Sequence, residues 1–449
     1  FNEKEKITEA EICDQHTGAL YDFKIQGGFY KYFLGSNYRE MWKQNVRIDC
    51  FNLAKEKFTV EKIDGSLRSP DFLIKDRMGN LYRLRPLKKE VRLPEVLRET
   101  IVETVLLDQQ SALNPLGFML VASLARDVGL PTEYPRLVYV DARQSAFAVW
   151  KDVKFKSGFY QLVRQPYFIL KDPEWKLKGV VEVITDKEMV HRVENESRYK
   201  VDQEAYLKAR LFDMMIGDWD RQKDQWYWMV VPDGKYNLLK PFPVDRDAAF
   251  YHSDGVVGWW RRRKWINYKL QDYARDLKHP NPMMIQSYSM DHRYLSNLTL
   301  EQWNKVVNDL QTQLTSDRME LAVSKLPIKI PERERQILVD SFKKRLQTLP
   351  QVAGKMRLAL RKNVDIIGTA DADRYVVQSG PGDFVEVTGA SKGEIVFSDK
   401  FDADVTREIR IYGLGGDDAF KLNWVNYNGV KVRLIPGAGN DKIVARDQK

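Results

Sequence analysis

The fold of this chain is decided by two acidic segments, Ile216-Gly-Asp-Trp-Asp-Arg-Gln-Lys-Asp-Gln-Trp226 and Pro243-Val-Asp-Arg-Asp-Ala-Ala-Phe250. A helix is predicted directly before the first segment, because Asp202 is suited to be its N-cap and Gly217 to end it. Two strands around a Pro-Asp-Gly turn are predicted within residues 226–250. Both segments therefore place carboxylates on short turns beside strands.

The order of these polar residues fits the chemistry of phosphoryl transfer. In that reaction one Asp accepts the hydroxyl proton, an amide or acid a few residues on holds a metal ion, and an Asp on the next strand holds the metal ion that bridges the phosphates. Asp220, Asp224 with the adjacent Gln225, and Asp245 follow each other in this order. The alternative is that the acids cap turns and pair with the arginines beside them, because acid-rich turns are common.

Composition excludes several classes of protein. The 449 residues include 72 Lys and Arg and 63 Asp and Glu, which gives a formal charge of +9. The length suffices for two or three domains, and 43% hydrophobic residues exclude a disordered chain. The longest apolar and small stretch, Leu116–Ala125, is about half of what a bilayer requires. Because the charge is mild for this length, a nucleic-acid partner is not expected.

The composition and periodicity of the sequence change three times along the chain. Residues 1–45 read as a mixed N-terminal extension, residues 46–145 as a strand-rich lobe, and residues 146–363 as a helix-rich lobe. From residue 364 to 449, glycines and short β-branched runs replace the helical pattern. The predicted class is α+β, with an all-β domain at the C-terminal end.

The two acidic segments resemble the catalytic core of the atypical kinases, which include the HipA-type, secretory-pathway and phosphatidylinositol kinases. That core reads roughly G-(N/D)-x-D-R-H-x-x-(N/E), followed by hydrophobic-D-x-G-x-A-F. More of the chain resembles a family of Bacteroidota outer-membrane proteins, in which such a module precedes a surface-antigen type β-barrel and can follow a calcineurin-like phosphoesterase domain. The matching stretches include FLGSNYREMW (33–42), LYRLRPLKK (81–89), VDQEAYLKARLFDMMIGDWDR (201–221) and IRIYGLGGDDAF (409–420).

The resemblance implies a two-lobed atypical protein-kinase-like fold with a C-terminal all-β domain and a site for ATP and Mg²⁺. Asp220, with Arg221 beside it, falls at the position of the catalytic base. Asp245 falls at the position of the stronger metal ligand, and Gln225 or its neighbour Asp224 at the position of the second ligand.

The resemblance also implies a phosphate-holding side of this site in the strand-rich lobe. The basic residue there is expected to be Arg85 or, just past the strand, Lys88, and Gly65 is the one glycine of the expected phosphate loop. An acidic partner of this basic residue is expected among Glu99, Glu103 and Asp108, which the sequence does not separate.

Departures from the kinase pattern weaken the site at several points. Gln222 stands where the pattern has His, and Asp247 replaces the usual glycine of the metal-binding turn. With one glycine, the loop around Gly65 allows a less close approach of the backbone to phosphate. The prediction is therefore a degenerate kinase that serves as an interaction or scaffold subunit. The alternative is an active Mg-ATP-dependent phosphotransferase with Asp220 as base and Asp245 as metal ligand.

The resemblance further implies a location outside the cytoplasm, at the outer membrane, on its periplasmic or cell-surface side. The chain begins at Phe1, so a fragment or processed chain is expected. The expected partners are an outer-membrane β-barrel or the subunits of a membrane complex. Cys13 and Cys50 are the two cysteines, and the sequence leaves open whether they form a disulfide.

Two further features of the sequence can each be interpreted in two ways. Gly-Asp turns contain Asp417, Asp418 and Asp441, which either bind Ca²⁺ as in calcium-binding β-rolls or simply join strands. The basic run Arg261-Arg262-Arg263-Lys264 follows two tryptophans, and it either binds an anionic surface or forms a solvated face.

Overall fold

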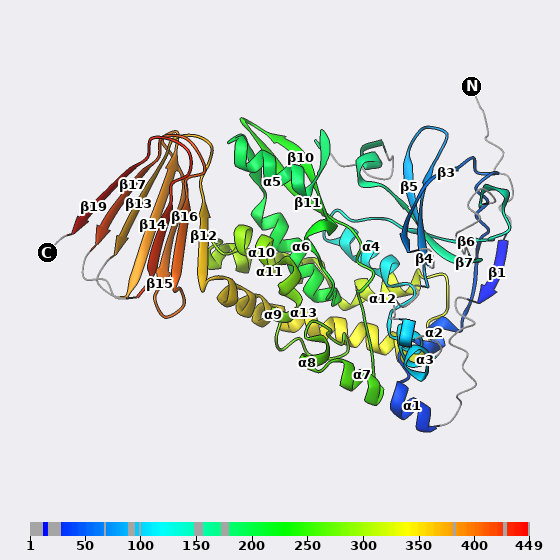
Figure 1. The fold of residues 1–449 in the computed structure, drawn as a ribbon. Coiled ribbons are helices and arrows are strands. Elements are labelled where there is room, and N and C mark those ends of the chain that lie inside the picture. Colours follow the sequence, from blue (N-terminus) through cyan, green and yellow to red (C-terminus); the bar gives the residue numbers. More distant parts are fainter. Residues whose placement is uncertain are drawn as a thin grey trace.

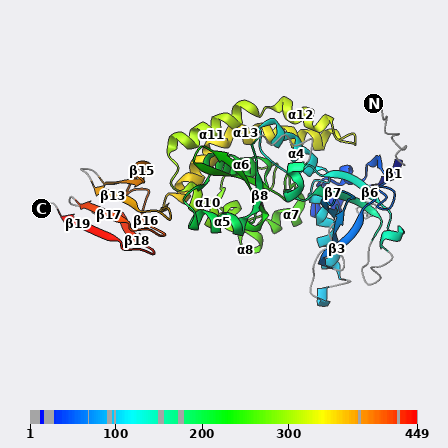
Figure 2. The same ribbon diagram turned by 90° about the horizontal axis from the view of Figure 1, so that it is seen from above.

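The computed structural model describes residues 12–16, 28–66, 69–88, 95–97, 100–147, 156–171, 179–379, 383–424 and 429–447. An N-terminal sheet and a sheet-rich C-terminal part lie at opposite ends of a helical middle part, and two perpendicular views agree on this (Figures 1 and 2). Within the described ranges, none of the helices combines the length and the apolar character that a bilayer span requires.

The N-terminal sheet has five antiparallel strands in the order β3-β4-β5-β7-β6. They are β3 (Thr59–Ser66), β4 (Ser69–Lys75), β5 (Leu81–Pro86), β6 (Arg136–Val140) and β7 (Gly158–Arg164). Strands β4 and β5 form a hairpin, and Gly79 in its turn has a φ of 82° that favours glycine. Alternate side chains of these strands form a core of their own.

The segment before this sheet contributes a strand pair and two short helices. They are β1 (Ile12–His16), α1 (Gly28–Leu34), α2 (Arg39–Trp42) and β2 (Asn45–Asp49), and β1 pairs antiparallel with β2. Cys50, which follows β2, is disulfide-bonded, and Cys13 is the other cysteine of the sequence.

The middle part is mainly helical. Its helices, together with those that join it to the N-terminal sheet, are α3 (Ile101–Asp108), α4 (Gly117–Asp127), α5 (Asp186–Asn195), α6 (Gln203–Ile216), α7 (Gly255–Arg261), α8 (Lys264–Asn267), α9 (Asn281–Met284), α10 (Tyr288–Leu295), α11 (Leu300–Gln313), α12 (Ser316–Ser324) and α13 (Glu332–Leu360). The largest core cluster contains residues of α4, α6, α10, α11, α12 and α13. The limits of the predicted domains remain predictions.

Helix α6 carries the first acidic segment at its C-terminal end. Asp202 caps it by accepting a hydrogen bond of 3.0 Å from the backbone N–H of Ala205. Gly217 ends it with a φ of 70°, so both predicted boundary signals are confirmed. Thr299 and Gln302 form a capping box at the start of α11.

A four-stranded sheet in the order β8-β10-β11-β9 delivers the second acidic segment. Its strands are β8 (Glu182–Thr185), β9 (Tyr199–Val201), β10 (Trp226–Asp233) and β11 (Tyr236–Pro243). The predicted hairpin is the β10–β11 pair, and Asp245 follows at the end of β11. The start of β10 and the end of β11 lie side by side, so the hairpin brings both acidic segments to the same end of this sheet.

The C-terminal part is a short parallel solenoid. Strands β12 (Asn363–Ile367), β16 (Glu408–Tyr412) and β18 (Lys431–Ile435) stack in parallel as one sheet. Strands β13 (Asp373–Ser379), β17 (Ala419–Trp424) and β19 (Lys442–Asp447) stack in parallel in the other, which the hairpin of β14 (Phe384–Ser391) and β15 (Glu394–Asp402) extends. The predicted α+β class with a sheet-rich C-terminal region is confirmed.

Candidate functional site

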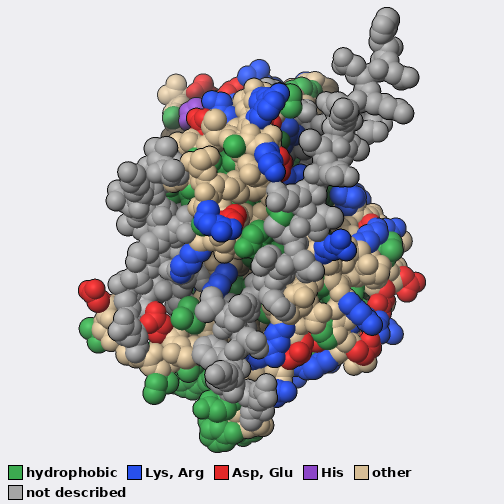
Figure 3. All heavy atoms as spheres, turned by 90° about the vertical axis from the view of Figure 1, so that its right-hand side faces the viewer, with side chains coloured by type: hydrophobic (Ala, Val, Ile, Leu, Met, Phe, Trp, Pro, Cys, Tyr) green, Lys and Arg blue, Asp and Glu red, His purple; other side chains and the backbone are tan. Residues whose placement is uncertain are grey.

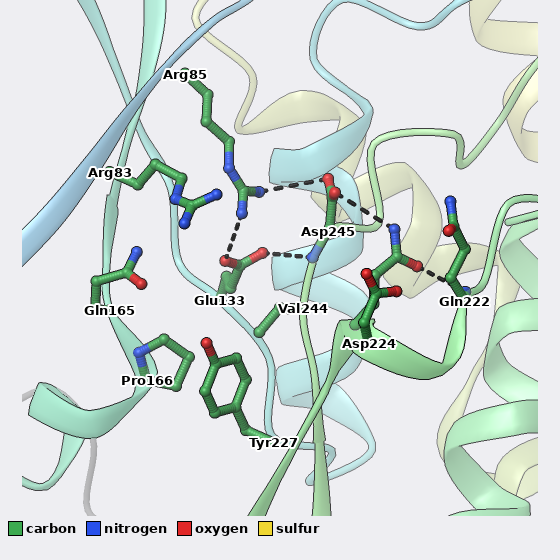
Figure 4. A pocket seen from close by; sticks show the side chains of 11 residues that line it. Arg83, Arg85, Glu133, Gln165, Pro166, Gln222, Asp224, Tyr227, Val244 and Asp245 are labelled. Atoms are coloured by element: carbon green, nitrogen blue, oxygen red, sulfur yellow. Dashed lines mark hydrogen bonds and ion pairs between the residues drawn. The ribbon is translucent and has the colours of Figure 1, made fainter. Parts of the chain in front are cut away.

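A cavity of about 290 Å³ lies between the N-terminal sheet and the edge of the β10–β11 hairpin. Its wall is mostly polar and comes from β5, the loops beside β6 and β7, and the two acidic segments (Figure 4). The lining residues are Arg83, Arg85, Glu133, Gln165, Pro166, Gln222, Asp224, Gln225, Tyr227, Val244 and Asp245. The structure thus brings four residues expected in the site to one cavity: Arg85, Asp224, Gln225 and Asp245.

Arg85 points from β5 across the cavity toward two carboxylates (Figure 4). Its Nη1 lies 3.4 Å from Oδ1 of Asp245, and its Nη2 lies 3.6 Å from Oε1 of Glu133. Burial alone lowers the pKa of Arg85, but the charges of Glu133 and Asp245 outweigh it and raise the pKa above its usual value. Arg85 is therefore a permanent cation in the wall of the cavity.

Asp245 has an unusual backbone conformation. Its φ is 59°, which is uncommon for a residue with a side chain and costs free energy that the surroundings have to supply. Its backbone N–H donates a hydrogen bond of 2.7 Å to Oε2 of Glu133. Glu133 therefore holds both the backbone of Asp245 and the guanidinium that reaches the Asp245 carboxylate.

Gln225 supplies an amide instead of an open ligand. Its Nε2 lies 3.4 Å from Oδ2 of Asp245, and its Oε1 accepts a hydrogen bond of 2.9 Å from the backbone N–H of Gln222. Nη1 of Arg221 also lies 3.5 Å from this oxygen, so the oxygen that could coordinate a metal ion already has two donors. Asp224 lies in the same turn, is exposed, and lines the cavity.

Asp220, expected to be the base, is not among the residues that line this cavity. Its Oδ1 lies 2.7 Å from Nζ of Lys269, and the same Nζ lies 5.4 Å from the ring centre of Trp219. The structure therefore places Asp220 in an ion pair with Lys269, outside the lining of this cavity.

Arg221 is fully buried beneath the site. It donates to the carboxylates of Asp213 at 3.1 Å and Asp218 at 2.7 Å, and to the backbone carbonyl of Val244 at 2.6 Å. Because Val244 precedes Asp245, Arg221 fixes the position of the cavity edge from below. The structure thus places Arg221 as a positioning residue in the core.

The carboxylates around Arg221 differ in their titration. Burial raises the pKa of Asp218 to about 7, although the charge of Arg221 acts in the opposite direction. One oxygen of Asp218, Oδ1, is buried without a hydrogen-bond partner, which agrees with a raised pKa. Asp213 is equally buried, but the charges of Arg221, Arg246 and Arg210 outweigh burial and lower its pKa.

Only some of the residues expected on the phosphate-holding side line the cavity. Lys88 follows β5 and is not among the described lining residues, and Gly65 lies in β3 opposite Pro70. Residues 67 and 68 of the expected phosphate loop lie outside the described residues.

The acidic group that pairs with Arg85 comes from a different segment than the sequence predicts. Glu99 lies outside the described residues, and Asp108 pairs with Arg39. The partner is Glu133, in the loop before β6. Its signal in the sequence is a carboxylate inside the otherwise apolar or turn-forming stretch Gly129-Leu-Pro-Thr-Glu-Tyr-Pro135, just before a buried strand.

The three aspartates that are candidates for Ca²⁺ binding accept backbone hydrogen bonds between the coils of the solenoid. Asp418 accepts from the N–H of Asp373 at 2.8 Å, and Asp441 accepts from the N–H of Asp418 at 2.9 Å. Asp417 accepts from the N–H of Asn440 at 2.9 Å. Within the described ranges, no group of three or more Asp, Glu, His or Cys side chains is arranged to hold a metal ion. These contacts agree with the alternative of turns that join strands.

Exchanging Asp418 for asparagine is expected to change how stability depends on pH. Burial and the neighbouring carboxylates of Asp373, Asp441 and Asp417 raise the pKa of Asp418 to about 6. The folded state therefore binds this proton more tightly, so stability falls as the pH rises from about 4 to about 6. Asparagine can still accept from the N–H of Asp373 without this loss.

The melting temperature of Asp418→Asn relative to the unchanged protein should accordingly rise between pH 4.5 and 7.5, as measured by circular dichroism. The matched control is Asn440→Ser, an exposed change in the neighbouring turn that removes no titrating group and should show a constant difference over this range. A constant difference for Asp418→Asn would contradict the assigned cause.

No model of a known protein family matches the chain, and no curated protein matches it. Among solved structures, the chain is similar to the proinflammatory kinase CtkA of Helicobacter pylori, with 11% identity, 69% of this chain and 99% of that chain covered, and a TM-score of 0.37.

It is also similar to the Rio2 kinase of Chaetomium thermophilum in an ADP/Mg²⁺-phosphoaspartate complex, with 12% identity, 66% and 74% coverage and a TM-score of 0.31. A third is HipA, in a complex with HipB and operator DNA from Shewanella oneidensis, with 9% identity, 67% coverage of each chain and a TM-score of 0.30. At such identities and TM-scores the likeness is a weak one of overall fold, and it assigns no activity to this chain.

Proposed function

We propose that the two lobes form a kinase-like module that acts as an interaction scaffold and does not transfer phosphoryl groups. The observation that carries this proposal is the state of Asp245, at the position expected for the metal ligand. Its carboxylate lies 3.4 Å from the guanidinium of Arg85 and 3.4 Å from the amide Nε2 of Gln225. A guanidinium thus supplies the positive charge that Mg²⁺ would supply in a kinase.

The rest of the site supports the same conclusion. A divalent cation would have to displace Arg85, which stays charged at every accessible pH. The neutral Oε1 of Gln225 is occupied by the backbone of Gln222. Asp220, which would accept the proton of a hydroxyl group, is neutralised by Lys269 at 2.7 Å.

A second candidate function is active Mg-ATP-dependent phosphotransfer, with Asp220 as base and Asp245 as metal ligand. It is favoured by the convergence of Arg83, Arg85, Asp224 and Asp245 on one polar cavity. Two arginines on one wall also suit the phosphates of a nucleotide. This function requires Arg85 to turn from Asp245 toward phosphate when the nucleotide binds.

The proposed setting is an outer-membrane-associated assembly, on its periplasmic or cell-surface side. The proposed partners are an outer-membrane β-barrel or other subunits of a membrane complex. This setting is supported by the resemblance of the sequence to Bacteroidota outer-membrane proteins.

Addition of millimolar MgATP should leave the melting temperature of the protein unchanged within about one degree. A ligand at a hundred times its dissociation constant would instead stabilise the folded state by about 2.7 kcal/mol. The measurement is differential scanning fluorimetry with MgATP, with ATP and EDTA, and with Mg²⁺ alone, on the unchanged protein and on Asp245→Asn.

Two results would support active phosphotransfer instead. One is a rise in melting temperature that needs both Mg²⁺ and ATP and is lost in Asp245→Asn. The other is transfer of labelled phosphate from ATP that is lost in both Asp220→Asn and Asp245→Asn. Lys223→Gln, an exposed change in the same turn, is the matched control because it should affect neither readout.

A further inference from the structure

Two short helical segments, residues 28–34 and 255–268, expose an unusual number of aromatic side chains. Phe29 is 69% exposed, Tyr32 67%, and Trp265 76%. Trp259 and Trp260 are each about half exposed. None of the residues of α1 is buried. These side chains therefore contribute little to the core, although each aromatic carries 150 to 250 Å² of surface, roughly, that water hydrates poorly.

The two segments form one surface, which we name the aromatic-basic face. Helix α1 packs against α7, and the N–H of Asn37, just after α1, donates a hydrogen bond of 2.9 Å to Asp254, just before α7. Gly35 and Gly255 approach so closely that a Cβ on Gly255 would lie 2.5 Å from the backbone nitrogen of Gly35.

The aromatic-basic face lies at one end of the molecule. The segments α1, α7 and α8 lie together at its lower edge (Figure 1), and hydrophobic side chains gather at the lower end of the face turned to the viewer in Figure 3. An aromatic surface at such an extremity can reach a flat partner without a clash from the rest of the chain.

The charge of the aromatic-basic face is of one sign. Neither segment contains Asp or Glu, and together they contain Lys31 and the basic run at 261–264. Arg262 turns inward to Asp272, at 3.2 Å. Arg263 lies 3.6 Å above the ring of Trp259 and is exposed, as is Lys264. The outward charge is therefore positive and interleaved with aromatic rings.

We infer that the aromatic-basic face binds the surface of a lipid bilayer that contains anionic headgroups. Trp and Tyr favour the headgroup region, where an apolar ring and a polar tip are both accommodated. Basic side chains next to them are attracted by anionic lipids, by about 1 kcal/mol each. A protein partner would also suit exposed aromatics, but the uniformly positive charge between the rings favours a uniformly negative plane.

The test is flotation of the 449-residue chain with vesicles of phosphatidylcholine alone and of phosphatidylcholine with phosphatidylglycerol. Binding is expected to the anionic vesicles, to weaken at high salt, and to quench tryptophan fluorescence when the lipids are brominated. Arg263→Gln with Lys264→Gln should lower the partition coefficient about thirtyfold, because each charge contributes about fivefold. Trp265→Ser should lower it about tenfold.

Matched controls distinguish a specific face from general adhesion. Ile395→Ser, which removes a 71% exposed apolar side chain in β15, and Arg407→Gln, which removes an exposed charge, should leave partitioning unchanged. Equal partitioning to neutral and anionic vesicles, or an equal loss in the controls, would overturn the inference. Binding of a protein that Trp265→Ser abolishes, without any binding to vesicles, would overturn it in favour of a protein-docking surface.

Discussion

Exchanging Asp213 for asparagine is expected to lower the free energy of unfolding by about 3–5 kcal/mol, as for other broken buried ion pairs. Asp213, on α6, lies 3.0 Å from Arg210, 3.1 Å from Arg221 and 2.9 Å from Arg246. Its side chain is fully buried. Asparagine has nearly the same shape, so the expected loss comes from charge and not from packing.

The size of this effect follows from the balance of charges in the cluster. Asp218 and Asp291 complete it, at 2.7 Å from Arg221 and 2.7 Å from Arg210. Three carboxyl groups then face three guanidinium groups, all of them almost inaccessible to water. Because the pKa of Asp218 is raised to about 7, the negative charge of the cluster does not exceed its positive charge. Asp213→Asn leaves one guanidinium uncompensated, and arginine cannot relieve this by losing its proton.

The measurement is urea denaturation of the unchanged protein, Asp213→Asn and the control Asp220→Asn. Asp220 forms a partly exposed pair with Lys269, so its exchange should cost at most about 1 kcal/mol. Midpoints for the two variants that agree within error would contradict the structural role assigned to the buried cluster. Equal midpoints would also make a catalytic role of Arg221, which lies within the cluster, compatible with the stability data.

Local signals in the sequence predicted the elements that position the site. The cap at Asp202, the stop at Gly217 and the β10–β11 hairpin depend on residues close in the chain, where side-chain and backbone chemistry act directly. The same locality explains why four residues of the cavity could be expected from two short segments and one strand.

Pairings between distant residues could not be predicted in the same way. Asp220 pairs with Lys269, and Arg85 pairs with Glu133, across turns whose spatial paths no local pattern determines. The match to the kinase motif placed Arg221 in the catalytic segment. In the structure its side chain turns into the core and pairs with Asp218. The alternative interpretation, in which the acids of these segments pair with the arginines beside them, is therefore correct for Asp218.

The solenoid shows a similar limit. Two Gly-Asp turns were visible in the sequence, but the corresponding turn before Asp373 lacks their run of glycines. The hydrogen bond from the N–H of Asp373 to Asp418 reveals it as the first coil of the same stack. Parallel stacking depends on contacts between coils, so the repeat is clearer in space than in sequence.

Exchanging Arg85 for alanine is expected to destabilise the protein by about 3 kcal/mol, the lower end of the range for broken buried pairs. The lower end applies because Asp245 is 31% exposed and water can reach its carboxylate in part. Burial already raises the pKa of Glu133, and the charge of Arg85 opposes this rise. Without Arg85, the neighbouring carboxylates of Glu133 and Asp245 would lack the cation that both of them contact.

The same exchange decides whether Arg85 stands in for a metal ion. Freed of the guanidinium, Glu133 and Asp245 form an acidic pair that suits a divalent cation with oxygen ligands. Millimolar Mg²⁺ or Mn²⁺ should therefore raise the melting temperature of Arg85→Ala by several degrees and leave that of the unchanged protein in place.

Arg83→Ala is the matched control for this response. Arg83 comes from the same strand and lines the same cavity, but it lies 3.8 Å from Asp71 and is about one-third exposed. Its loss should cost at most about 1 kcal/mol and should create no response to divalent cations. If Arg85→Ala responds to Mg²⁺ no more than Arg83→Ala does, Asp245 is not a latent metal ligand. The likeness of this cavity to a kinase site would then extend to its position between the lobes but not to its chemistry.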